Sequence, residues 1–255
     1  MRRLVLSILV IGSIALAGAS EPVSVGYLGH SCFTIQASEG PIIMIDPYAS
    51  YVPFPALPQP ADVVLMTHAH IDHCPPCHGE ANRYTGDPIV VAPWDSQGRI
   101  REGNWRITDD VLVRFTEASH VTAGGGGQGY VCLFSFEVGG IRFAHLGDVG
   151  KLLTGSQMAA LAGVEVLFLP VGGAYTINAA EAMTVIAQLP SVKVVLPMHY
   201  RVDGITPWPD MAPLTDFTVL ADTLYPVLTK DADQVIVDSE SLPESVEIWV
   251  LDFKK

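Results

Sequence analysis

The chain has few basic residues. It holds 14 Lys and Arg against 27 Asp and Glu in 255 residues, which gives a formal net charge of −13. Proteins that bind nucleic acid carry basic faces that neutralise phosphates, so this composition excludes nucleic acid as the main partner. The same shortage disfavours attraction to an anionic membrane surface. An acidic surface mainly favours solubility and identifies no partner by itself.

Long apolar runs are also missing, except at the start of the chain. Arg2 and Arg3 precede the apolar run Leu4–Leu16, and small residues from Ala17 to Ala19 follow it. This order is typical of a secretory signal peptide, and an uncleaved anchor is the alternative. No Cys follows the run, so a lipid anchor is not indicated. We therefore expect a signal peptide at 1–20 and a single domain at 21–255, periplasmic or secreted, with no stable membrane insertion after cleavage.

Cysteine is scarce, yet two of the four cysteines, Cys74 and Cys77, form a Cys-x-x-Cys pair. Three interpretations are open: a local disulfide, a redox pair, or soft metal ligands. An exported chain meets an oxidising compartment, which favours the disulfide.

Four of the chain's potential metal ligands lie within six positions. His68, His70, Asp72 and His73 directly follow the apolar run Val63–Met66, which has the pattern of a buried strand. Ligands at the carboxyl end of a strand match the usual position of sites in α/β sheets. Imidazoles and a carboxylate suit zinc, and also iron or manganese. The spacing therefore predicts a metal site here.

Apolar runs that alternate with turn residues predict a mixed α/β fold. The expected strands are 23–27, 32–36, 41–46, 63–66, 89–92, 111–115, 130–136, 140–146, 164–170, 192–197, 235–237 and 245–253. We expect helices at 94–106 (a short helix and turn), 155–162, 179–188 and 214–224, with Asn178 as a cap of the third. The proline-rich segment 49–60 is excluded from helix and central strand, and is either a substrate wall or a surface crossover. The glycine-rich segment 121–129 is either a flap beside the metal or a plain hairpin connection.

Several motifs together carry a family resemblance. The His68-x-His70-x-Asp72-His73 motif resembles the signature of the metallo-β-lactamase superfamily of metal-dependent hydrolases. The flanking motifs resemble those of ascorbate-6-phosphate lactonase-like proteins, and comprise Gly29–Ile35, Ile45–Pro47, Leu146–Asp148 and Pro197–Tyr200. The similarity runs from Val23 to Tyr200. It implies a four-layer αββα sandwich, with two sheets face to face and helices on both outer faces.

The resemblance also implies a site that holds two metal ions. One ion would be held by His68, His70 and His120, and the other by Asp72, His73 and His199. Asp148 would bridge them, since a carboxylate between two divalent cations is what such a site requires. Zinc is the expected metal, with manganese or iron as alternatives.

Further residues have expected supporting roles. Asp46 is either a second-shell carboxylate that orients a ligand, as the resemblance suggests, or a plain turn residue before proline. His30, Tyr175 and Tyr200 are candidate donors to the substrate. His145 is expected to be a packed core histidine rather than a ligand.

The function that follows is an exported metal-dependent hydrolase. An activated hydroxide would attack an ester, lactone or phosphodiester bond of a small-molecule substrate, with Asp72 and Asp148 as catalytic ligands. The alternatives are a non-catalytic periplasmic metal-binding protein and an iron-dependent oxidoreductase on the same fold. The sequence identifies neither the substrate nor the oligomeric state.

Overall fold

The computed structural model describes residues 21–54, 59–81, 84–109, 111–122 and 128–253. The expected signal peptide and most of the glycine-rich segment therefore lie outside the described residues. No helix in the described part of the chain is long and apolar enough to cross a membrane.

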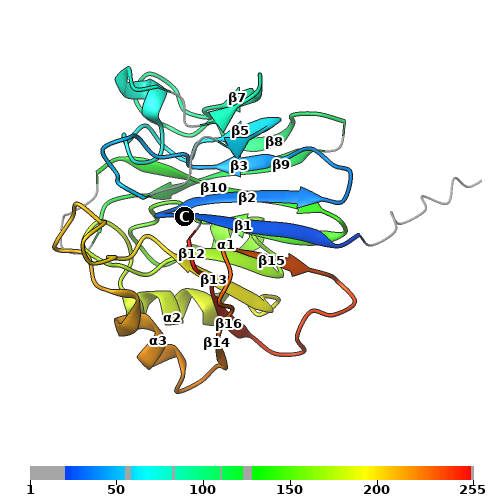
Figure 1. Cartoon of the computed structure of the whole chain (residues 1–255), viewed down its shortest axis with the longest axis vertical. Helices are drawn as coiled ribbons and strands as arrows, with labels where there is room; N and C mark the ends of the chain where they lie inside the picture. The colour runs from blue at the N-terminus through cyan, green and yellow to red at the C-terminus, as the bar shows by residue number, and fades with distance from the viewer. Residues whose placement is uncertain (1–20, 55–58, 82–83, 110, 123–127, 254–255) are drawn as a thin grey trace, which may run out of the picture.

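Two β-sheets pack face to face (Figure 1). The first has six strands in the order β15 (Gln234–Val237), β1 (Val23–Gly29), β2 (Cys32–Ala37), β3 (Ile43–Ile45), β5 (Val63–Leu65) and β7 (Ile89–Val91). The second has eight strands in the order β14 (Val227–Thr229), β16 (Glu247–Val250), β13 (Val194–Met198), β12 (Val166–Pro170), β11 (Ile141–His145), β10 (Tyr130–Val138), β9 (Leu112–Ser119) and β8 (Gly103–Arg106). A separate pair joins β4 (Gln59–Pro60) to β6 (Tyr84–Thr85).

The main hydrophobic core lies between the two sheets. Alternate residues of the six-stranded sheet, such as Val25, Phe33 and Ile45, belong to one buried cluster with Phe134 and Phe168 of the other sheet. The central strands β11, β12 and β13 pair in parallel, and β12 and β13 are buried along their whole length. Continuous apolar runs suit parallel strands that are covered on both faces.

The three α-helices of the described chain follow β11 in sequence and pack on the eight-stranded sheet (Figure 1). They are α1 (Gly155–Ala160), α2 (Ala179–Gln188) and α3 (Leu214–Ala221). The side chain of Asn178 accepts from the backbone N–H of Ala180 and Glu181, and Glu181 reaches back to the Asn178 N–H. This capping box confirms the predicted start of α2.

Loops, rather than an α-helix, cover the outer face of the six-stranded sheet in the described chain. Tyr48, with Val52 and Phe54 of the proline-rich segment, forms a second buried cluster with Leu28 and Met44 of the sheet. The Phe54 ring lies so close to Gly29 that a Cβ atom there would be 2.3 Å from a ring carbon. On this side the outer layer of the sandwich consists of loops in the described chain, because prolines prevent the covering segment from becoming helical.

The structure has no helix at 94–106, so that prediction is wrong. Trp94 and Ile100 form a β-bridge, and β8 pairs antiparallel with β9. The Asp95 carboxylate accepts from the backbone N–H groups of Gln97 and Arg99, so a side-chain-stabilised turn replaces the first helical turn. The absence of this helix is a local difference, and the four-layer sandwich of the metallo-β-lactamase type agrees with the prediction.

Candidate metal centre

The predicted ligands gather at one edge of the two sheets because each follows the end of a strand. The cluster from His68 to His73 follows β5, His120 follows β9, Asp148 follows β11, and His199 follows β13. His30 lies in the tight turn between β1 and β2. Strands from both sheets thus bring these residues together from distant parts of the sequence.

Asp46 fixes the orientation of two histidines in the cluster. Its carboxylate accepts hydrogen bonds from the Thr67 backbone N–H at 2.7 Å, the Thr67 hydroxyl at 2.7 Å and His73 Nδ1 at 2.8 Å. Because the single Thr67 hydroxyl proton points to Asp46, Thr67 Oγ1 must accept from Nδ1 of His68, 3.0 Å away. In its neutral form each of these histidines then has a free lone pair at Nε2, which is the form that binds a metal.

The Oδ2 atom of Asp148 lies among four imidazoles. It is 3.1 Å from Nε2 of His199, 3.2 Å from His73, and 3.8 Å from both His68 and His120. Asp148 is 2 % exposed, so water cannot replace these neighbours. The arrangement places one carboxylate oxygen in the middle of the predicted ligand set.

The ligand atoms fall into three overlapping groups. His68, His70 and His120 form one group, and their ligand atoms lie within 4.8 Å of one another. Asp72, His73 and His199 form another together with His30. Asp148 joins His68 and His73 in a third, so it stands between the first two. The structure therefore brings together all seven predicted ligands.

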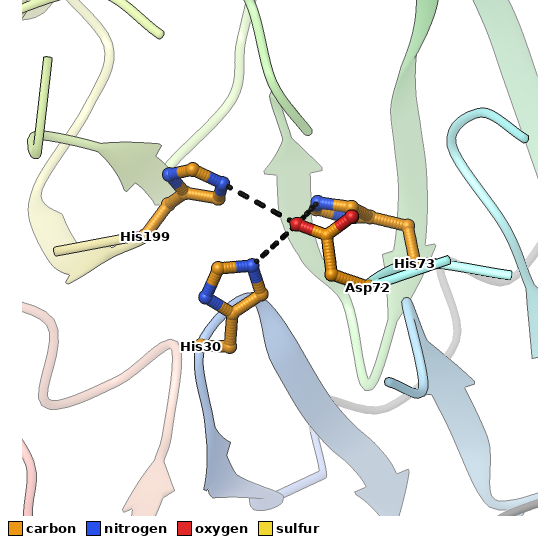
Figure 2. A group of neighbouring side chains, drawn as sticks. All are labelled: His30, Asp72, His73 and His199. Atoms are coloured by element: carbon orange, nitrogen blue, oxygen red, sulfur yellow. Dashed lines mark hydrogen bonds and ion pairs between the residues drawn. The ribbon is translucent and has the colours of Figure 1, made fainter. Parts of the chain in front are cut away.

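His30 belongs to the second group through the carboxylate of Asp72 (Figure 2). Its Nε2 lies 3.0 Å from Asp72 Oδ2, which is also 3.5 Å from Nε2 of His73 and 4.0 Å from Nε2 of His199. The His30 ring is fully buried and stacks on Trp208, with centroids 5.1 Å apart. The buried His30 therefore fixes the position of the Asp72 carboxylate through this hydrogen bond.

The electrostatics favour the ligand forms of these side chains. Burial lowers the pKa of His68, and lowers the pKa of both His30 and His120 to about 4. Burial opposes ionisation of Asp148, but His199 and His73 outweigh it and hold the pKa of that carboxyl well below its usual range. At neutral pH the three imidazoles are neutral and the carboxylate is charged, as metal binding requires.

His73 shows that the cluster needs positive charge. Burial alone would lower its pKa, but Asp148, Asp72 and Asp46 outweigh burial and raise that pKa well above the ordinary value. Carboxylates that surround one imidazole are stabilised by a proton or by a divalent cation at that position. The donor set therefore fits a metal ion.

Unpartnered buried atoms support the same fit. Nε2 of His68, Nε2 of His73 and Oδ1 of Asp148 are buried without a hydrogen-bond partner among the described residues. Leaving buried polar atoms unsatisfied costs free energy, unless they coordinate a metal. The two imidazole nitrogens lie 3.8 Å and 3.2 Å from Asp148 Oδ2, at the centre of the ligand cluster.

The backbone at the site adopts conformations that ordinary residues avoid. His30, Asp46 and His199 have φ values of 54°, 48° and 51°. The His199 N–H donates to the carbonyl of His30 at 2.9 Å, and a Cβ on Gly172 would lie 2.1 Å from the His199 carbonyl oxygen. Such strain persists where the surrounding structure holds a side chain in a required position.

A cavity of about 350 Å³ opens above the ligands. Tyr175 lines it, as expected of a substrate donor, and its wall also contains residues that the sequence did not single out: Tyr51, Ile71, His78, Gln128 and Trp208. Tyr51 belongs to the proline-rich segment 49–60, which was a candidate substrate wall, although no single residue of that segment was named. No sequence pattern indicated Trp208.

Tyr200 does not reach this cavity. Its side chain is 7 % exposed and hydrogen-bonds to Tyr27 in the core between the sheets. Tyr200 lies beyond the end of β13, and the φ of 51° at His199 turns the backbone at the ligand, so the next side chain enters the core. The prediction of Tyr200 as a substrate donor is therefore wrong in this structure.

Two other predictions concern residues beside the ligands. Cys74 and Cys77 form a disulfide, while Cys32 and Cys132 are free and buried. His145 is fully buried, with Nε2 2.9 Å from the carbonyl of Ser31 and Nδ1 accepting from the Gly147 N–H. Both ring nitrogens are satisfied, so His145 is a core residue as predicted.

Known proteins share this architecture. Residues 24–199 match the model of the beta-lactamase superfamily domain. A UPF0173 metal-dependent hydrolase of Thermococcus onnurineus is 33% identical over 74% of this chain and 88% of its own length. One from Methanosphaera stadtmanae is 29% identical over 70% of this chain and 84% of its own length.

A solved structure from Thermotoga maritima, of the metallo-beta-lactamase superfamily, has a TM-score of 0.67 and 28% identity. The match covers 91% of this chain and all of that one. Together with the motif and its geometry, these likenesses assign the family. The chain therefore belongs to the metallo-β-lactamase superfamily and, within it, to the metal-dependent hydrolases.

Proposed function

We propose that the protein is an exported hydrolase whose site holds two divalent metal ions and cleaves an ester, lactone or phosphodiester of a small molecule. The observation that carries the proposal is the position of Asp148, whose Oδ2 lies between 3.1 and 3.8 Å from four imidazole Nε2 atoms. A single metal ion would not need a carboxylate shared by two ligand groups. A bridge between two ions does.

The residues divide between the two ions as their groups do. His68, His70 and His120 would hold one ion, and Asp72, His73 and His199 the other. When bound, such a pair lowers the pKa of a water molecule toward neutrality and polarises the bond under attack. Nitrogen and oxygen donors suit zinc, and the same set admits manganese or iron.

The protein's own residues orient this chemistry. Asp46 fixes the tautomers of His68 and His73 through the contacts described above, and His30 holds the carboxylate of Asp72. Tyr175 lines the cavity beside Asp148 and can donate a hydrogen bond to the substrate. No serine nucleophile is needed, because the attacking oxygen comes from water.

The test is the substitution Asp148→Asn, which keeps the size of the side chain and removes its charge. We expect metal content to drop below two ions per chain, and turnover to fall by at least about 100-fold, since loss of even outer-shell partners costs 10- to 100-fold. Metal analysis and hydrolysis of a panel of lactones, esters and phosphodiesters measure both effects.

The matched control is Asp203→Asn, because Asp203 is a carboxylate whose side chain is 85 % exposed and pairs with Arg201. It should keep two ions and full turnover. Near-wild-type turnover of Asp148→Asn with both ions retained would contradict the bridging role. Two ions in a wild-type protein that cleaves nothing in the panel would favour a metal-binding protein instead.

A further inference from the structure

The cavity above the ligands has two different walls. Its floor is made by the ligands themselves, and its upper wall by three loops that carry Tyr51, Tyr175 and Trp208. Ile71 and Gln128 complete that wall, and His78 lies at its rim. A substrate whose scissile bond lies at the floor must therefore place the rest of its structure against this upper wall.

The upper wall offers an aromatic surface. The rings of Tyr51 and Trp208 meet edge to face, with centroids 5.9 Å apart and an angle of 81°. Trp208 is held by its stack on His30, while Tyr51 remains 43 % exposed beside the cavity. Aromatic side chains that stay accessible beside a reactive site are suited to hold a planar apolar group.

The same wall lacks a fixed positive charge. No Lys or Arg lines the cavity among the described residues. Arg201, two residues after the ligand His199, already binds Asp203 and the carbonyls of Pro209 and Met211. A phosphate or carboxylate remote from the scissile bond is normally recognised by such groups. Here it would find no counter-ion among the described residues.

Tyr51 adds to this selection against anions. Its phenol is neutral at neutral pH, because a tyrosine hydroxyl ionises only near pH 10. The phenol can donate one hydrogen bond but cannot offset a negative charge. The formal charge of −13 on the whole chain also repels anionic substrates as they approach.

We propose that the substrate is a neutral ester or lactone whose planar apolar part lies against Tyr51 and Trp208. This inference rests on the proposed function for the identity of the reaction, but concerns a different contact. It narrows the ester, lactone or phosphodiester of the proposed function to an uncharged ester or lactone. The aromatic pair, rather than a cation, is then what distinguishes one substrate from another.

Binding of three uncleaved amides to the metal-loaded protein tests the inference independently of turnover. The probes are phenylacetamide, acetamide, and phenylacetamide that carries a para-sulfonate group. The sulfonate adds a fixed negative charge and ligates metals only weakly. We expect phenylacetamide to bind at least about tenfold more tightly than either of the other two, as measured by calorimetry. Equal or tighter binding of the sulfonate would overturn the proposal.

Variants then locate the contact. Tyr51→Ala and Trp208→Ala should each reduce the preference for phenylacetamide over acetamide by several-fold to about tenfold. Trp105→Ala is the matched control, because Trp105 is 46 % exposed on β8 and does not line the cavity. Trp208→Ala also removes the stack on His30, so the metal content of this variant is measured as well. Tyr51→Ala removes no ring contact with a ligand and therefore tests the aromatic contact alone.

The methyl esters of the same three acids separate this inference from the proposed function. If no ester is cleaved while the amides keep the expected order, the hydrolase proposal fails and the binding inference stands. An unchanged preference in Tyr51→Ala with two metal ions retained would overturn the inference, whatever the turnover of the esters.

Discussion

At the scale of single residues, the carboxylate of Asp46 does more than its position before a proline suggested. Three donors converge on it, two from Thr67 and one from His73, and it is fully buried. It therefore connects the end of β5 to a ligand in the cluster. A carboxylate that orients a metal ligand was one of two interpretations of Asp46 in the sequence, and these contacts favour it.

The substitution Asp46→Asn should weaken metal binding. An amide can accept with only one atom, so its N–H₂ group would face either the Thr67 backbone N–H or both donors at Oδ2, the Thr67 hydroxyl and Nδ1 of His73. We expect metal affinity to fall about 10- to 100-fold, measured by competition with a chelator. Asp62→Asn is the matched control, because Asp62 accepts one backbone hydrogen bond at an exposed position. Equal affinities in the two variants would contradict the orienting role.

His145 should contribute to the pH dependence of stability. Burial lowers its pKa in the folded protein, so between that value and the unfolded value of about 6.5 only the unfolded chain binds the proton. Stability is then present above pH 6.5 and decreases as the pH falls below it. Urea unfolding of the metal-free protein between pH 7 and 5 measures this slope.

The variant His145→Gln remains neutral and can keep the bond to the carbonyl of Ser31. Its slope should be smaller than that of the wild type by up to one proton, or about 1.4 kcal/mol per pH unit. Identical slopes would mean that His145 keeps its ordinary pKa in the fold.

At the scale of elements, the loop after β5 carries four ligands and is closed by a disulfide. Cys74 and Cys77 join at the start of the 3₁₀ helix η1 (Pro75–His78), directly after His73. Nε2 of His78 also reaches back to the carbonyl of Ala69. Both contacts restrict the segment that presents Asp72 and His73.

Replacing both Cys74 and Cys77 by Ala should separate stability from metal binding. The disulfide encloses so few residues that its loop-closure contribution is about 2 kcal/mol or less. Affinity for the ion at Asp72, His73 and His199 should fall more clearly than affinity for the ion at the other three histidines. Chelator titration of both ions measures the difference, and an equal loss at both would contradict a local role.

Thiol titration provides an independent check of the pairing. The denatured, unreduced wild-type protein should expose two thiols, those of Cys32 and Cys132, because the other two cysteines are bonded. A count of four free thiols would show that Cys74 and Cys77 are not joined by a disulfide.

At the scale of the whole molecule, we propose that the chain is exported after removal of its first residues. The exported protein should begin between Ala19 and Pro22, where small residues follow the apolar run. N-terminal sequencing of protein from the periplasm or medium tests this. Intact Met1 on protein confined to the cytoplasm would contradict export, while the fold and the site would stand.

The local pattern of the chain determined much of this protein. Alternating and continuous apolar runs specified most strands and the helix after Asn178, because these signals depend only on neighbours in sequence. The spacing of His68, His70, Asp72 and His73 indicated a metal site for the same reason. The Asp95 carboxylate stabilises a turn by accepting from backbone N–H groups that follow it. This is a local preference too, but a helix was predicted for the segment instead.

Tertiary structure alone decided how distant residues meet. Trp208, more than 150 residues along the chain from Tyr51, completes an aromatic wall that no local pattern encodes. Asp148 became the centre of four imidazoles because the ends of distant strands meet only once the sheets have packed. Tyr200 entered the core because the backbone turns at His199, just beyond β13. Short-range preferences thus specified most elements and the ligand types, while long-range packing decided how the ligands and the cavity wall come together.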